Sequence, residues 1–182
     1  MSLVLVLILA SLSSAPCEEA LEELVRIAVA ECPGQRKKGD EKTIRLLLEM
    51  EKKAKTGLLG LVVAAACRES RFTHRPMPPG DGGLAVGLLQ LHPWWELRYG
   101  IDRTNPVEST KAYLHRIGKL TKKAKRLCEN RDPYLVAQAW VASGPDRYRC
   151  RYSRHYSLWR RWARKMMPQN RSCIGYGKRR RH

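Results

Sequence analysis

The stretch GLLGLVVAAACRESRF, residues 57–72, places an eleven-residue apolar run, 57–67, directly before Arg68 and Glu69. The run is too short to span a membrane and predicts a buried core helix. A charged side chain on such a helix is costly unless it is paired or functional. A partly desolvated glutamate retains its proton at neutral pH, as a general acid requires. Glu69 is therefore a candidate catalytic acid, and the alternative is a solvent-facing residue in a salt bridge with Arg68 or Arg71.

The segment after this helix is rich in proline and glycine. HRPMPPGDGG, residues 74–83, holds three prolines and three glycines and predicts a loop. LAVGLLQLH, residues 84–92, is long enough only for a short strand or hairpin. Glycines let the backbone approach a ligand closely, and an amide such as Gln90 suits hydroxyl-rich or N-acetylated sugars. The segment therefore predicts one wall of a groove that faces Glu69.

The rest of the pattern is helical. Asp40 is the expected N-cap of one helix, and Asn105 and Asp132, each followed by proline, mark the starts of two others. A chain of 182 residues suffices for one domain with a proper core. We expect a mainly α single domain with a small β-hairpin or loop element after the central helix. The flanking helices are expected at residues 17–32, 40–55, 105–130, 132–143 and 153–166.

The beginning of the chain and its cysteines indicate export. Residues 1–15 combine an apolar run with small residues, as in a signal peptide, which leaves 16–182 as the mature domain. A membrane anchor or a lipid on Cys17 are the alternatives; with the signal removed, we expect no transmembrane span. Six cysteines in an exported chain predict a disulfide framework of at least two bridges, with fifteen pairings open. No spacing of cysteine and histidine suits zinc, so we expect neither a metal nor a cofactor. The cysteines are Cys17, Cys32, Cys67, Cys128, Cys150 and Cys173.

The net charge of +18 is concentrated in one part of the chain. Residues 1–110 hold fourteen basic and fourteen acidic side chains, whereas residues 111–182 hold twenty-one basic and three acidic ones. Such a field attracts polyanions such as cell-wall polymers, lipopolysaccharide, anionic lipid or nucleic acid. Signatures of specific nucleic-acid binding are absent, so nucleic acid would bind through charge alone.

Aromatic and basic residues alternate in the basic extension, about 146–182. The aromatic residues recur at helical spacing, which indicates either a face that covers the core, with the arginines in solvent, or a polymer-binding surface. The residues are Tyr148, Tyr152, Tyr156 and Trp159, interleaved with Arg147, Arg151, Arg154 and Arg160.

Four short motifs follow one another in a familiar order. They are ESRF (69–72), GLLQLHP (87–93), NPVESTKAYL (105–114) and AWVASGP (139–145). Together they resemble the motifs of soluble lytic transglycosylases and goose-type lysozymes, over residues 57–145. Leu89 stands where that family usually has methionine, and Trp140 and Val141 replace its usual Tyr-Asn pair.

The resemblance implies a lysozyme-like fold and cleavage of the β-1,4 bond between N-acetylmuramic acid and N-acetylglucosamine in peptidoglycan. Glu69 would be the general acid and then the base. Asp81 would be a second catalytic group if the enzyme is a goose-type hydrolase; otherwise it is a turn residue. We favour the non-hydrolytic reaction, which yields a 1,6-anhydro sugar and needs one carboxyl group. The residues expected to contact sugar are Ser70, Leu89, Gln90, His92 and Trp140, with His92 at the rim.

These expectations describe an exported, monomeric enzyme, periplasmic or secreted, that acts on peptidoglycan glycan strands. Residues 111–182 would associate with anionic wall polymers or lipopolysaccharide. The rival interpretation is a cationic protein without catalytic activity that binds wall polymer or nucleic acid through the same residues.

Overall fold

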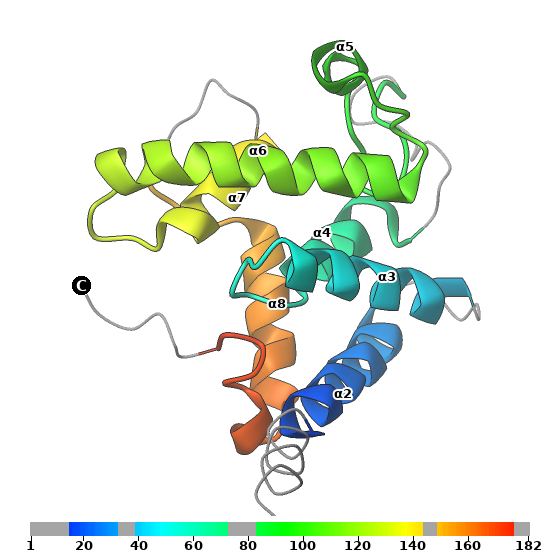
Figure 1. The fold of residues 1–182 in the computed structure, drawn as a ribbon, viewed down its shortest axis with the longest axis vertical. Helices are drawn as coiled ribbons and strands as arrows, with labels where there is room; N and C mark the ends of the chain where they lie inside the picture. Colours follow the sequence, from blue (N-terminus) through cyan, green and yellow to red (C-terminus); the bar gives the residue numbers. More distant parts are fainter. Residues whose placement is uncertain (1–14, 33–38, 73–82, 144–148, 177–182) are drawn as a thin grey trace, which may run out of the picture.

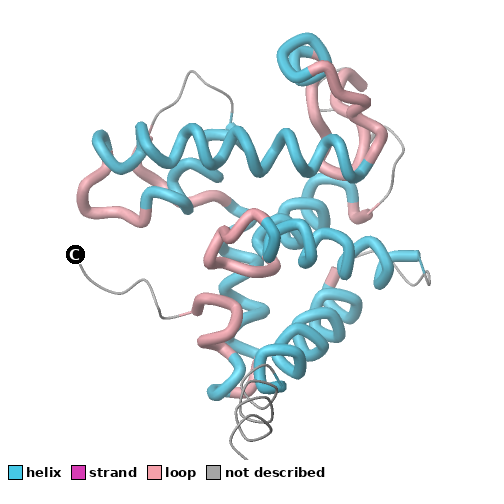
Figure 2. The backbone as a smooth tube through the Cα atoms, in the orientation of Figure 1, coloured by secondary structure: helices cyan, strands magenta, loops and turns pink. Residues whose placement is uncertain are grey.

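A computed structural model describes residues 15–32, 39–72, 83–143 and 149–176. These residues are mainly helical, as predicted, and they contain no β-strand (Figures 1 and 2). In chain order the elements are α2 (Ala15–Glu31), α3 (Gly39–Lys53), α4 (Leu61–Ser70), α5 (Trp94–Tyr99), α6 (Pro106–Leu127), α7 (Pro133–Ser143), α8 (Arg154–Lys165) and the short 3-10 helix η1 (Pro168–Asn170).

The apolar stretch forms α4, which lies between α3 and α8. Residues 61–67 are all buried, which confirms the predicted core helix. In Figure 1, α6 crosses the upper part of the view below α5, with α7 packed along it, α8 runs downward past α4, and α2 lies below. Because α4 is covered on several sides, only its last turn reaches the surface.

The start of α4 is capped by a residue from another helix. Gly60 precedes the helix with a φ of 90° and supplies no side-chain cap. Glu51 of α3 replaces that cap, because its Oε2 accepts the amide hydrogen of Gly60 at 2.6 Å and its Oε1 that of Val62 at 2.7 Å. A carboxyl group at a helix N-terminus satisfies amides that the helix cannot. Glu51 thus joins α3 to α4 and fixes where α4 begins.

Polar residues at the predicted positions cap two other helices. Asn105 Oδ1 accepts the amide hydrogens of Val107 and Glu108 at the start of α6. Asp132 Oδ1 accepts those of Tyr134 and Leu135 at the start of α7. Both predicted starts are confirmed. Helix α8 is capped in the same way by Ser153, whose Oγ accepts the amide hydrogen of Tyr156.

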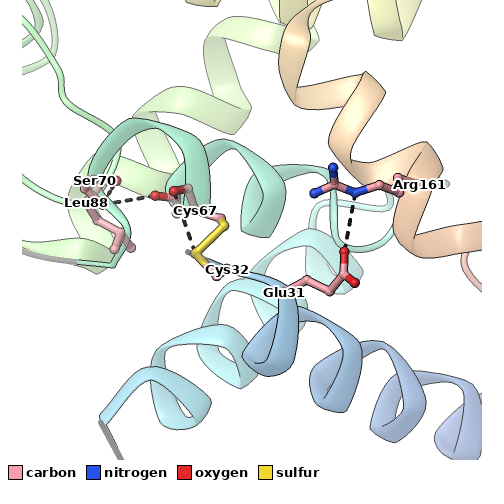
Figure 3. The surroundings of a disulfide bond; sticks show 7 residues. Glu31, Cys32, Cys67, Ser70, Leu88 and Arg161 are labelled. Carbon is pink, nitrogen blue, oxygen red and sulfur yellow. Dashed lines mark hydrogen bonds and ion pairs between the residues drawn. A yellow bond between two sulfur atoms is a disulfide. The ribbon is translucent and has the colours of Figure 1, made fainter. Parts of the chain in front are cut away.

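Three disulfides link segments far apart in the sequence, which confirms the predicted framework. Cys17 pairs with Cys173, Cys32 with Cys67, and Cys128 with Cys150. Figure 3 shows the second of these, which ties the residue after α2 to the buried helix α4. Disulfides persist in oxidising compartments, so this framework is consistent with export. The part of the chain that the structure describes has no helix both long and apolar enough to cross a bilayer.

Two local details differ from the sequence pattern, and a third follows one of its two alternatives. Helix α3 begins at Gly39, one residue before Asp40, the expected N-cap. The described residues 83–93 form turns with an isolated antiparallel bridge between Val86 and Leu91, which is the loop alternative. A short helix, α5, follows it; the sequence pattern did not predict it, because six residues are too few to show a helical period.

Candidate active site

Glu69 lies in the last turn of α4, where the buried helix reaches the surface. Its side chain is 38% exposed, although the residues of the preceding turns are buried. The helix ends at Arg71, which adopts a left-handed conformation with a φ of 53° and donates its amide hydrogen to the carbonyl of Cys67. The carboxyl group is therefore held at the boundary between core and solvent by a helix of defined length.

The partner of Glu69 is a histidine from another helix. His155 of α8 places its Nε2 2.6 Å from Glu69 Oε1, although the two residues are 86 positions apart. The imidazole side chain is 5% exposed, so it approaches Glu69 from the core side. This contact replaces the salt bridge with Arg68 or Arg71 that was the alternative interpretation of Glu69. One carboxylate oxygen is thus engaged from inside the protein.

Behind His155 lies a buried polar chain from α6, α7 and the start of α8. Gln138 Nε2 is 2.5 Å from His155 Nδ1 and 3.1 Å from the hydroxyl of Tyr113. Ser153 Oγ donates to Gln138 Oε1, and Gln138 is fully buried. Burial raises the pKa of Tyr113 well above its ordinary value, so its hydroxyl stays neutral. Residues from α6, α7 and α8 therefore support the imidazole that contacts Glu69 of α4.

The glycine-containing loop is docked on the end of α4. Ser70 Oγ donates to the carbonyl of Leu88 at 2.7 Å, as Figure 3 shows, and also contacts the carbonyl of Ala66. Gly87 has a φ of 76°, and a Cβ atom there would come within 2.0 Å of the carbonyl oxygen of Arg103. Only glycine fits this close approach. The loop is thus fixed beside Glu69 by contacts on both sides.

The other residues that were predicted to contact sugar differ in how far their side chains are exposed. Gln90 is half-buried, with a φ of 47°, and its amide donates to the carbonyl of Gly87. His92 is exposed and Leu89 is buried. Ser70 is also fully buried, so contact with a sugar would require both Ser70 and Leu89 to move.

Trp140 belongs to the core in this structure. Its side chain is 1% exposed, and its indole N–H donates to the carbonyl of Arg149 at 2.9 Å. Its role as a sugar contact stays a prediction. Asp81, the second catalytic candidate, lies outside the described residues.

The aromatic residues of the basic extension face inward where the structure describes them. Trp159 is buried and donates its indole N–H to the carbonyl of Leu59, while Tyr152 and Tyr156 are half-buried. Arginines alternate with them on the exposed side: Arg151, Arg154 and Arg160. This arrangement matches the interpretation of a face that covers the core. Tyr148 and Arg147 lie outside the described residues.

His155 is the site residue that the sequence pattern missed. It lies three residues before the buried Leu158 and seven before the buried Trp162, so helical spacing alone places it on the inner face of α8. That signal predicts burial but not a partner, because nothing in the local sequence connects α8 to the end of α4.

Two hollows on the surface lie away from Glu69. One, of about 660 Å³, lies between α2, α3 and η1 and contains the ion pair of Arg45 with Glu22. The other, also of about 660 Å³, lies between α3 and α6. Its apolar or small lining residues are Met50, Ala54, Leu114 and Gly118, and its basic lining residues are Lys53, Lys111, His115, Lys119 and Lys122. No acidic residue lines this second hollow.

Among the described residues no group of three or more histidine, cysteine, aspartate or glutamate side chains is arranged to hold a metal ion. Comparison with known protein families, with curated proteins and with solved structures gives no match to this chain.

Proposed function

We propose that this protein cleaves the β-1,4 glycosidic bond between N-acetylmuramic acid and N-acetylglucosamine in peptidoglycan, and that its fold is lysozyme-like. The observation that carries the proposal is the pairing of Glu69 with His155 at the exposed end of a buried helix. A carboxyl group supported from the core and open on its other side is arranged as a general acid. The resemblance of the four motifs supplies the substrate.

One carboxyl group is sufficient for the proposed non-hydrolytic reaction. Glu69 donates its proton to the glycosidic oxygen as the bond from that oxygen to C1 of the muramic acid breaks. The resulting carboxylate then removes the proton of the C6 hydroxyl of the same sugar while the C6 oxygen attacks C1. The products are a free N-acetylglucosamine hydroxyl and a 1,6-anhydro muramic end, and Glu69 regains its proton. No water is consumed, so no second carboxyl group is required.

The alternative outcome is hydrolysis with Asp81 as the group that positions water. An inverting hydrolase needs two carboxyl groups roughly 6.5–9.5 Å apart. Asp81, in the sequence GDG at 80–82, is the candidate near the cleft motifs. The non-hydrolytic reaction is favoured because Glu69 suffices for it.

The products of wall digestion separate these two reactions. We expect mass spectrometry of digested peptidoglycan to show muramic ends that lack one water relative to reducing ends, and Asp81→Asn to retain activity. Predominantly reducing muramic ends, together with loss of activity in Asp81→Asn, would show a hydrolase of the goose type instead. Absence of any cleavage by the wild-type protein would favour a wall-binding protein without catalytic activity.

The hollow between α3 and α6 is the part of the basic surface best suited to hold an anionic wall polymer or lipopolysaccharide. Four lysines and a histidine line it together with the apolar Met50 and Leu114, and no acidic residue lines it. Exposed charges of this kind raise the local concentration of a polyanion through a field that salt screens within about 10 Å at 0.1 M.

Charge removal at this hollow should weaken wall binding. We expect the double variant Lys119→Ala, Lys122→Ala to bind purified walls about three- to thirty-fold less tightly at low salt, since each exposed charge contributes up to about 1 kcal/mol. The difference should shrink as salt is added. The matched control Lys42→Ala, Arg98→Ala also removes two exposed charges but lies outside the hollow. Equal losses in the two variants would show that only net charge matters.

A further inference from the structure

The orientation of the Gln138 amide determines which nitrogen of His155 carries a proton. Ser153 Oγ accepts the amide hydrogen of Tyr156 at 3.1 Å as the cap of α8, which leaves its own hydroxyl hydrogen to donate. That hydrogen points to Gln138 Oε1, so the oxygen of the amide faces Ser153. Gln138 Nε2 then donates its two hydrogens to Tyr113 and to His155 Nδ1. A donor facing Nδ1 requires that Nδ1 be unprotonated.

We infer that His155 is held as the neutral tautomer protonated on Nε2 and that it is a positioning residue for Glu69. With Nδ1 accepting from Gln138, the ring proton lies on Nε2 and is donated to Glu69 Oε1 at 2.6 Å. A second proton on the ring would face the amide hydrogens of Gln138 and would place a charge on a side chain that is 5% exposed.

The consequence for Glu69 rests on the proposed function. Because Nε2–H occupies Oε1, the proton that Glu69 delivers lies on Oε2, the oxygen that His155 leaves open. When that proton leaves, the carboxylate becomes a stronger acceptor for Nε2–H, so the hydrogen bond stabilises the charge that forms. His155 keeps its proton throughout, and a single proton passes through Oε2. The two carboxyl oxygens thus have different tasks.

The tautomer is tested without reference to activity. Nitrogen-15 NMR of the histidine side chains, with the His155 signals assigned by their absence in His155→Gln, should show Nε2 protonated and Nδ1 unprotonated at about pH 8. An ordinary histidine is neutral at this pH, so the measurement reports the tautomer. A ring protonated on Nδ1 would overturn the inference and would indicate a Gln138 amide turned the other way.

Removal of the Nε2–H donor of His155 should lower the rate of cleavage and leave the affinity for substrate unchanged. We expect His155→Leu to reduce kcat on short muropeptide oligomers about ten- to hundred-fold with little change in KM, as for loss of a hydrogen bond to a charged group. His155→Gln, whose amide can still donate, should recover most of that loss. Leu158→Ala, on the same face of α8, is the control for lost stability alone and should retain wild-type kcat. Equal rates in His155→Leu and the wild type would show that His155 only packs.

Gln138→Glu changes the donor to an acceptor at nearly constant shape. A carboxylate at this position accepts from Nδ1, so the ring proton should move to Nδ1 or the ring should become charged, as the same NMR measurement will show. We expect kcat to fall at least ten-fold, with a new dependence on pH between about 5 and 8. If the His155 tautomer were unchanged in Gln138→Glu, the Gln138 amide would not determine which ring nitrogen of His155 is protonated. If the wild-type protein cleaves no wall, the proposed function fails, and the NMR result still decides the tautomer.

Discussion

Replacing Glu69 with glutamine should reduce the cleavage of purified cell walls at least a hundred-fold, because general acid catalysis typically contributes about a hundred- to ten-thousand-fold. The amide has nearly the same shape as the carboxyl group and its oxygen can still accept from His155 Nε2–H. The contact between α4 and α8 is therefore kept, and only the transferable proton is removed. Loss of turbidity of a wall suspension measures the rate.

The binding of walls separates this prediction from a general loss of structure. Glu69→Gln should pellet with walls as the wild type does and should unfold at a similar temperature. Glu129→Gln, which changes an exposed glutamate beyond the end of α6, is the matched control and should cleave at the wild-type rate. More than about a tenth of the wild-type activity in Glu69→Gln would exclude Glu69 as the acid. No cleavage by any form, with binding intact, would identify a cationic wall-binding protein.

The parts of the fold that the sequence predicted correctly are those fixed by neighbouring residues. Asn105 and Asp132 cap α6 and α7 because a short polar side chain followed by proline satisfies the first amides of a helix locally. The apolar run predicted α4 because a helix buried on all sides needs such a run. The position of Glu69 at the end of that helix followed from the same local pattern.

The parts that could not be predicted depend on contacts between distant residues. His155 contacts Glu69 although 86 positions separate them in the sequence. The residues next to each of them do not predict the helix arrangement that brings the two side chains together. The disulfide pairs likewise follow from the assembled fold, since spacing alone leaves all fifteen pairings open. Asp40 was preferred as the cap of α3 on residue type, but the helix begins at Gly39.

The contacts of Glu51 are also ones that the sequence pattern did not reveal, and its removal should cause a large loss of stability. It is fully buried, and its two oxygens accept the amide hydrogens of Gly60 and Val62. In Glu51→Ala both amides lose their acceptor. Each unsatisfied buried donor costs about 1–3 kcal/mol, so we expect the free energy of unfolding to fall by about 2–6 kcal/mol. Denaturant unfolding at constant pH measures this loss.

The same residue should make stability depend on pH in an unusual direction. Burial raises the pKa of Glu51 to about 8 from 4.5, although its hydrogen bonds to the amides of Val62 and Gly60 oppose the change. The unfolded chain therefore releases this proton at lower pH than the folded chain. The stability that Glu51 contributes is fully present below about pH 4.5 and is lost as the pH rises through about 8. A shift of this size corresponds to a loss on the order of 5 kcal/mol as an upper bound.

Glu51→Gln isolates this contribution, because an amide of the same shape does not titrate and the other groups of the protein are unchanged. We expect the free energy of unfolding of the wild type, minus that of Glu51→Gln, to decrease steadily between about pH 5 and 8. Measuring the difference at each pH removes the effect of the net charge of +18, which changes almost equally in both proteins. A difference that is constant or that rises with pH would mean that the amide hydrogens of Gly60 and Val62 stabilise a buried carboxylate, with Glu51 ionised in the folded protein.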